Sequence, residues 1–246
     1  CTALDSWTPL LPHLAPRFDL VVPDLPGHAR SRVHHRAALS LPGMAAALAD
    51  LLARLDAPPA LVAGHSAGAP LGLELARRLP VPPRGLVGID PAFHVGVPFQ
   101  GTALWAPIAR IATSRRLARW LARRLARPGA LDRLVAATRS VLPPDSLATY
   151  AALARSPRHV HRCLAMMAAW DLESLTRAIP ALRLPVLLLA GERDPWFPPR
   201  HVARAAAHFR SATSAIVPGT GHFSHEEQPG AVAAHLLAFA AGLGLA

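Results

Sequence analysis

The sequence predicts an α/β fold in which a mostly parallel sheet is covered by helices on both faces. Three observations support this prediction. Short β-rich runs alternate with helical stretches, the runs are almost continuously apolar, and 246 residues suffice for one large domain. Because 52% of the residues are hydrophobic, the chain can bury a sizeable core.

Each element is predicted from local spacing and bounding turn residues. Five strands are expected, at Phe18–Pro23, Ala60–Ala63, Gly85–Ile89, Pro185–Ala190 and Ser214–Val217. Apolar residues recur at helical spacing in four stretches, Leu41–Leu55, Ala69–Leu79, Pro199–Phe209 and Ala231–Ala240. The alternation stops between about Ala92 and Leu184, where the sequence is helical and rich in Arg. We therefore expect a core formed by residues 1–92 and 185–246, with residues 93–184 inserted as a helical cap.

The composition excludes several classes of function. All 26 basic residues are Arg in a chain crowded with Ala and Pro, so the formal charge of +11 follows a composition bias. Aromatic residues do not alternate with the arginines as they do in single-strand binding surfaces, and we expect no nucleic-acid partner. No apolar run reaches the roughly 18–20 residues that span a bilayer.

The two cysteines, Cys1 and Cys163, cannot form a disulfide framework, which is typical of a protein from the reducing cytoplasm. Cys163 could ligate a metal together with His159 and His161. However, the chain has no C-x-x-C or H-E-x-x-H pattern to support that interpretation. We expect neither a metal nor an organic cofactor.

The segment Gly64-His65-Ser66-Ala67-Gly68 follows an apolar strand and opens a helix. This is the G-x-S-x-G nucleophile elbow in the strand–turn–helix context that it requires. Small neighbours allow a sharp turn, which lifts the serine hydroxyl above the sheet at a helix N-terminus. Ser66 is the predicted nucleophile and the Ala67 N–H an oxyanion donor. The alternative is an ordinary Gly-rich turn with a helix-capping serine.

A serine nucleophile needs a positioned base and an orienting acid, and in this architecture the acid comes first along the chain. Asp194 lies just beyond the fourth predicted strand and His222 just beyond the fifth. Both loops therefore project toward the edge that carries Ser66. Asp90 is the rival acid and His225 the rival base. Asp194 could also be a loop residue that bonds only its own backbone.

Four segments resemble the α/β-hydrolase superfamily along nearly the whole chain: VVPDLPGHARS, GHSAG, GERDPWFPP and GTGHFSHEEQP. Two longer ones are similar to the magnesium-chelatase accessory proteins of bacteriochlorophyll biosynthesis (the BchO type): LSLPGMAAALADLLARLDAPPALVAGHSAGA and SPRHVHRCLAMMAAWDLESL. The resemblance implies the α/β-hydrolase fold with a helical cap, and a pathway that works on carboxylated tetrapyrroles.

The sequence departs from this family in two places. Family members carry a strand that ends in a His-Gly oxyanion loop before the helix that here includes Trp7–Leu14, and nothing before Cys1 supplies it. We therefore expect a fragment that lacks its N-terminal strands, with a gap in the sheet beside Ala60–Ala63. Such a chain would lack the second oxyanion donor and be unstable and weakly active. Ala29 also replaces the second glycine of the family's GHG turn and is expected to distort it slightly.

The cap sequence contains a basic amphipathic segment, Arg110–Arg127. Its arginines recur at three-to-four spacing beside an apolar stripe, a pattern typical of helices that lie on anionic membranes. The segment could also contact magnesium chelatase or pair with tetrapyrrole propionates. Alternatively, the segment is a cap helix that packs its apolar stripe on the domain and exposes its arginines to water.

Several residues are candidates for substrate binding because they are apolar, flat or adjacent to the elbow. Met166, Met167 and Trp170 suit the wall of a large apolar pocket, although they could equally be the core of the cap. The candidate set also contains His65, Pro98, Phe99, Trp105 and Trp196.

The motifs predict a serine hydrolase that cleaves an ester or related acyl bond, and the resemblance implies that it acts as a magnesium-chelatase accessory protein in bacteriochlorophyll and porphyrin biosynthesis. The alternatives are a non-catalytic tetrapyrrole-binding accessory factor and a general carboxylesterase unrelated to pigment synthesis. The expected substrate is a small molecule, possible partners include the chelatase, and the expected location is the cytoplasm, with peripheral membrane contact as an option.

Overall fold

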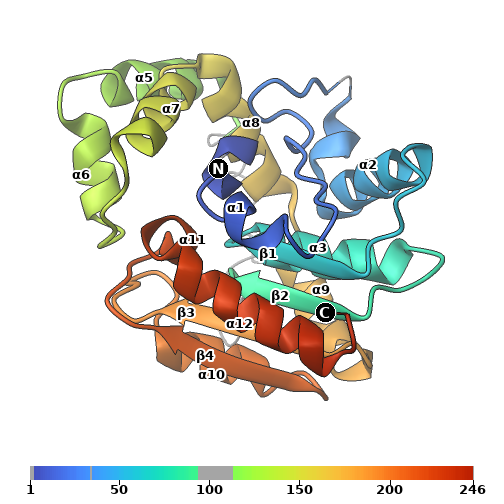
Figure 1. Ribbon diagram of the computed structural model, residues 1–246. Helices are drawn as coiled ribbons and strands as arrows, with labels where there is room; N and C mark the ends of the chain where they lie inside the picture. The colour runs from blue at the N-terminus through green and yellow to red at the C-terminus, as the bar shows by residue number, and fades with distance from the viewer. Residues whose placement is uncertain (1–2, 34, 94–112, 246) are drawn as a thin grey trace.

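The computed structural model describes residues 3–33, 35–93 and 113–245 (Figure 1). Its strands form one parallel sheet in the order β1 (Leu61–His65), β2 (Gly85–Ile89), β3 (Val186–Gly191) and β4 (Ala212–Val217). The register pairs Leu61 with Gly85 and Leu86 with Val186. Because all the pairs are parallel, the four carboxyl ends lie at the same edge of the sheet.

Helices cover both faces of the sheet, because alternate strand residues point to opposite sides. Leu86 and Leu188 pack into one hydrophobic cluster with α2 (Leu41–Arg54), α3 (Gly68–Arg78) and α10 (Pro199–Ala206). Val87 and Leu189 pack into a second cluster with α1 (Leu11–Leu14) and α12 (Pro229–Gly242), which lies in front of the sheet in Figure 1.

The run Phe18–Pro23 does not form the strand that the sequence predicts. The backbone N–H groups of residues 19–22 make no hydrogen bond within the described residues. Leu20 and Val21 are 37% and 44% exposed. The composition of the run favours an extended backbone, but a strand also needs a neighbour to share its hydrogen bonds. In the described sheet, β1 is an edge strand that pairs only with β2, so the prediction is wrong for this run.

The helix expected at Trp7–Leu14 is divided into two short pieces, η1 (Leu4–Trp7) and α1. Further along, η2 (Arg36–Leu39) leads directly into α2, whose N-terminus is capped by Ser40. The Ser40 side chain accepts a hydrogen bond from the Gly43 N–H, which satisfies a backbone donor of the first helical turn.

In its described residues, the chain between β2 and β3 contains helices joined by turns and no strand, as the sequence predicts. It forms α5 (Arg115–Leu125), α6 (Ala130–Ala136), α7 (Pro144–Ala154), α8 (Pro157–Ala169), α9 (Leu172–Ala178) and η3 (Ile179–Ala181). After β4 comes the short helix α11 (Ser224–Glu227). None of the helices in the described ranges is long and apolar enough to cross a bilayer.

Candidate active site

Ser66 lies in a strained turn between β1 and α3. Its φ of 51° falls in the left-handed region, where residues with a Cβ are rare. A Cβ on Gly64 would lie 2.2 Å from the Gly68 carbonyl oxygen, so the turn requires glycine at position 64. A Cβ on Gly68 would meet nothing within 4 Å. The steric requirement that the sequence analysis gave to both glycines is therefore found at Gly64 alone.

The Ser66 hydroxyl lies beside His222, on the loop that follows β4. His222 Nε2 is 3.1 Å from Ser66 Oγ, and His222 Nδ1 is 2.7 Å from Asp194 Oδ2. Both His222 and Asp194 are buried. If Nδ1 donates to the carboxylate, Nε2 is left unprotonated and can accept the hydroxyl proton of the serine. The structure thus brings together the three residues that the sequence singled out.

Asp194 is fixed by hydrogen bonds from its own loop. Its Oδ1 accepts from the Trp196 N–H at 2.7 Å and from the Phe197 N–H at 3.2 Å, while Oδ2 faces His222. The aspartate therefore bonds its own backbone and also contacts the imidazole, so the two interpretations of Asp194 are compatible. The backbone contacts hold the carboxylate in one orientation.

Aromatic rings enclose the His222 imidazole. The centroids of Trp196, Phe197, Phe223 and His65 lie 4.9, 5.7, 5.5 and 4.9 Å from that of His222. His65 Nε2 also lies 2.7 Å from the His222 carbonyl oxygen, and as the donor it anchors the base through its backbone. Burial lowers the pKa of His65 well below its usual value, so its ring is neutral at pH 7.

Asp90, the rival acid, follows β2 and is fully buried beneath this site. Its Oδ1 accepts from the Gly191 N–H at 2.6 Å, and its Oδ2 accepts from the backbone and hydroxyl of Ser224 at 3.1 and 2.7 Å. These bonds join the loop that carries Asp194 to the loop that carries His222. Burial raises the pKa of Asp90 to about 8. Its position is that of a brace between the two loops.

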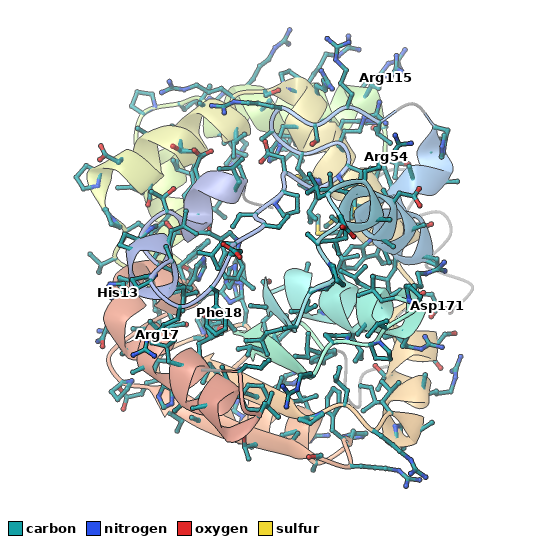
Figure 2. All side chains as sticks on the ribbon, turned by 45° about the vertical axis from the view of Figure 1, so that its right-hand side comes forward. His13, Arg17, Phe18, Arg54, Arg115 and Asp171 are labelled. Atoms are coloured by element: carbon teal, nitrogen blue, oxygen red, sulfur yellow. The ribbon has the colours of Figure 1, made fainter. Side chains whose placement is uncertain are left out.

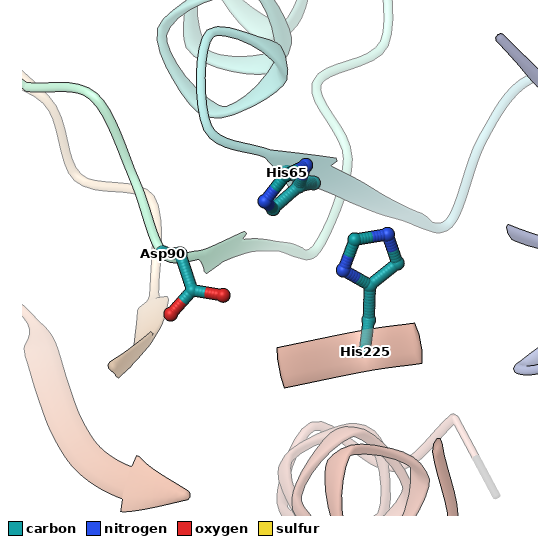
Figure 3. Close-up of side chains that lie close together, drawn as sticks. All are labelled: His65, Asp90 and His225. Carbon is teal, nitrogen blue, oxygen red and sulfur yellow. The ribbon is translucent and has the colours of Figure 1, made fainter. Parts of the chain in front are cut away.

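His225, the rival base, is buried in α11. Its Nε2 lies 2.8 Å from Ser6 Oγ, and burial lowers the pKa of His225 to about 3. Figure 3 shows His225 beside His65 and Asp90, and these three residues offer ligand-type atoms within 4.8 Å of one another. The hydrogen bonds of Asp90 already occupy both of its oxygens, which argues for a structural role of the cluster.

The Ala67 N–H, the predicted oxyanion donor, is at the start of α3, where unpaired backbone N–H groups favour negative charge. It makes no hydrogen bond inside the described ranges and is therefore available to a ligand. Ala29, which replaces the second glycine of the family's GHG turn, has a φ of 40°. The turn thus keeps a left-handed conformation despite the Cβ.

The predicted substrate-binding residues differ in their surroundings. Trp196 is 50% exposed beside His222, and Met167 is 47% exposed on α8. Trp170 is buried and donates its indole N–H to the Leu39 carbonyl, so it belongs to the hydrophobic core together with Met166. Other candidates lie outside the described residues, namely Pro98, Phe99 and Trp105.

The conceivable metal group around Cys163 is only partly assembled. Cys163 Sγ lies 3.4 Å from His159 Nε2, whereas His161 Nε2 faces the Thr113 carbonyl oxygen at 2.9 Å. Burial alone would raise the pKa of Cys163, but hydrogen bonds with His159 and His28 lower it to about 6. The second histidine beside this thiol, after His159, is therefore His28 and not His161.

The sequence analysis missed the supporting contacts of the site. It did not foresee that His65 holds the backbone of His222, or that Ser224 completes the brace at Asp90. The only available signal was the position of each residue beside a catalytic candidate. That signal does not say which atoms meet.

Comparisons with known proteins agree with this geometry. A family model described as the alpha/beta hydrolase family matches residues 4–235. The Magnesium-chelatase 30 kDa subunit of Rhodobacter capsulatus is 38% identical over 224 residues, or 90% of this chain and 77% of that protein.

An esterase from another organism is also similar. The Pimeloyl-(acyl-carrier protein) methyl ester esterase of Xanthomonas oryzae pv. oryzae (strain MAFF 311018) is 31% identical over 218 residues, covering 88% of this chain and 82% of that protein. Among solved structures, a thermophilic esterase from Thermogutta terrifontis has a TM-score of 0.71 at 20% identity, covering 98% of this chain and 86% of that one. At this identity, the structural match concerns the fold alone.

Proposed function

This chain belongs to the alpha/beta hydrolase family, and from that premise we propose that it is a serine hydrolase with Ser66 as nucleophile. In this proposal His222 is the general base and Asp194 the acid that orients it. The observation that carries it is the continuous hydrogen-bonded series from Asp194 Oδ2 through the imidazole to Ser66 Oγ. A serine on an ordinary capping turn would not need a buried base and acid.

The reaction begins when His222 Nε2 takes the hydroxyl proton while Ser66 Oγ forms a bond to the acyl carbon of an ester. The carbonyl oxygen becomes negative, and the Ala67 N–H donates to it. The imidazolium, held by Asp194, then gives its proton to the leaving alcohol as the ester bond breaks. A water molecule, deprotonated by His222, hydrolyses the acyl-enzyme and releases Ser66 and the acid.

The biological setting that we propose comes from the relatives. Similarity to a magnesium-chelatase subunit suggests a role as an accessory protein in bacteriochlorophyll synthesis, with a tetrapyrrole ester as the substrate. The half-exposed Trp196 ring beside the base supports a planar substrate, because flat aromatic surfaces stack on one another. Similarity to a methyl ester esterase supports ester cleavage.

A second candidate function is a non-catalytic accessory factor that binds a tetrapyrrole or contacts the chelatase. The similarity to a chelatase subunit supports it without requiring turnover. Under this proposal the Ser66 site would be retained as a scaffold. In both cases we expect the arginine-rich part of the cap to face an anionic partner.

Labelling with a fluorophosphonate probe separates these functions. We expect stoichiometric labelling of the wild type and none of Ser66→Ala, because only an activated serine attacks the probe. Ser214→Ala, which removes an exposed hydroxyl from β4, is the matched control and should label like the wild type. A folded wild-type protein that resists labelling but binds a tetrapyrrole would contradict the hydrolase and favour the accessory factor.

A further inference from the structure

The helix α5 has two faces of opposite character. Ala118 and Ala122 are buried, and this small-residue face packs against α8. The outer face carries Arg116, Arg119 and Arg123, which are exposed and line a surface hollow of about 310 Å³ together with Trp120. We call these four residues the α5 surface. Figure 2 shows that Arg115, at the start of the same helix, lies at the outer edge of the molecule.

The arginines of the α5 surface have no counter-charge among the residues that the structure describes. Over the part of the chain that the structure describes, none of them makes an ion pair or a hydrogen bond, whereas Arg77, Arg78 and Arg177 each pair with a glutamate. No Asp or Glu occurs between residues 115 and 131. The positive charge of this helix is therefore uncompensated within its own sequence.

Neighbouring elements add to the same positive field. Burial lowers the pKa of Arg162 on α8, and repulsion from Arg158, Arg115 and Arg36 lowers it further. These side chains come from η2, α5 and α8, so the field extends beyond one helix. Positive residues of three elements thus form a surface that is complementary to a polyanion.

Trp120 indicates which polyanion fits. Its side chain is 53% exposed among the arginines, and the Arg124 guanidinium lies 5.3 Å from its ring centroid. An exposed indole flanked by guanidinium groups suits the headgroup region of a bilayer, where the ring enters the interface and the cations meet lipid phosphates. The pairing of an exposed aromatic ring with charges of one sign is the pattern by which interfacial helices bind anionic membranes.

We infer that the α5 surface docks the protein on an anionic lipid bilayer, with the Trp120 ring in the headgroup layer and Arg116, Arg119 and Arg123 on the phosphates. This inference goes beyond the proposed hydrolase function, because none of the four residues belongs to the Ser66 site. It concerns where the protein works rather than what it cleaves.

The test is co-sedimentation with vesicles made of equal amounts of phosphatidylglycerol and phosphatidylcholine. We expect binding to these vesicles, no binding to phosphatidylcholine alone, and release by high salt. The double variant R119E/R123E should lower the partition coefficient by roughly thirtyfold or more. W120A should weaken binding to a smaller extent.

The matched control is R200E/R204E on α10, an exposed pair with the same four-residue spacing and the same change in net charge. In Figure 1, α10 lies at the opposite end of the view from α5. Equal loss of binding in both double variants would show attraction by net charge alone and overturn the inference. The inference would also be overturned if the wild-type protein did not bind anionic vesicles, whether or not it bound an acidic protein. Both variants should keep wild-type labelling of Ser66, which separates this test from that of the hydrolase.

Discussion

The carboxyl edge of the sheet and the outer face of α5 differ in how their ionisable groups are surrounded. At the sheet edge Asp194, His222 and Asp90 are buried, and each is held by hydrogen bonds of 2.6–3.2 Å. On α5, Arg119 and Arg123 are exposed and have no partner within the described chain. Buried groups act through fixed geometry, so small changes there have large effects. Exposed charges act through their summed field and tolerate single substitutions.

Asp194→Asn should give the largest difference between the two regions. The amide cannot hold His222 in the tautomer that accepts the serine proton, and kcat/KM for an activated ester should fall by roughly 10⁴-fold, the order seen for this change in a serine protease triad. Asp132→Asn makes the same substitution at an exposed position of the cap and should leave kcat/KM unchanged. Similar activities of the two variants would remove Asp194 from the mechanism.

Gly64→Ala tests how tightly the elbow is packed. The new Cβ would meet backbone atoms at 2.2 Å, and we expect a loss of about 3 kcal/mol in the free energy of unfolding. In the cap, a Cβ on Gly129 would meet the flexible ends of the Arg133 and Asp132 side chains at 3.2 and 4.0 Å, although its φ is 68°. Gly129→Ala should therefore cost only about 1 kcal/mol. Chemical denaturation measures the free energy of unfolding of both variants. A larger loss of stability in Gly129→Ala than in Gly64→Ala would contradict the expectation that the elbow is packed more tightly than the cap.

Asp90 should give a smaller, pH-dependent effect. Its pKa is about 8 in the folded protein and about 3.9 in an unfolded chain, so the folded state binds more protons between these values. Taken alone, this shift makes the free energy of unfolding fall as pH rises toward 8. The lowered pKa values of His65, His225 and Cys163 act in the opposite sense, the histidines chiefly below about pH 7 and Cys163 between about pH 6 and about pH 8.5.

The measurement is the difference between the wild-type and Asp90→Asn slopes of the unfolding free energy from about pH 7 to about pH 8, because the contribution of Cys163 is common to both proteins and cancels. Asp90→Asn should make the slope more positive than in the wild type, and Asp132→Asn should keep the wild-type slope. An unchanged slope in Asp90→Asn would show that the buried carboxyl is ionised throughout the range.

Much of the fold could be predicted because its signals are local. The runs that form β1, β2, β3 and β4 were expected to within two residues at each end, because short runs of apolar and β-branched residues bounded by turn residues favour strands. The elbow was equally local, because glycines around a serine between a strand and a helix specify one turn.

Other features depend on partners that are distant in the sequence. Phe18–Pro23 has strand composition but lacks a neighbouring strand, so it forms no strand, and the backbone N–H groups of residues 19–22 make no hydrogen bond within the described residues. Asp90 and Asp194 both follow strands at the same edge. The sequence favoured Asp194 as the acid over its rival Asp90, but it did not predict that Asp90 braces the two loops. Their roles depend on loop conformations, which place one carboxylate at His222 and the other at Ser224.

The sequence by itself determined the class of fold, the elbow at Ser66 and the set of residues that could serve it. Only the tertiary structure decided that Asp90 braces the two catalytic loops, which of Met167 and Trp170 is buried, and which arginines have no counter-charge among the described residues. The reason is physical: periodicity and turn chemistry act between residues close along the chain, whereas hydrogen bonds, burial and electrostatic fields depend on distances in space.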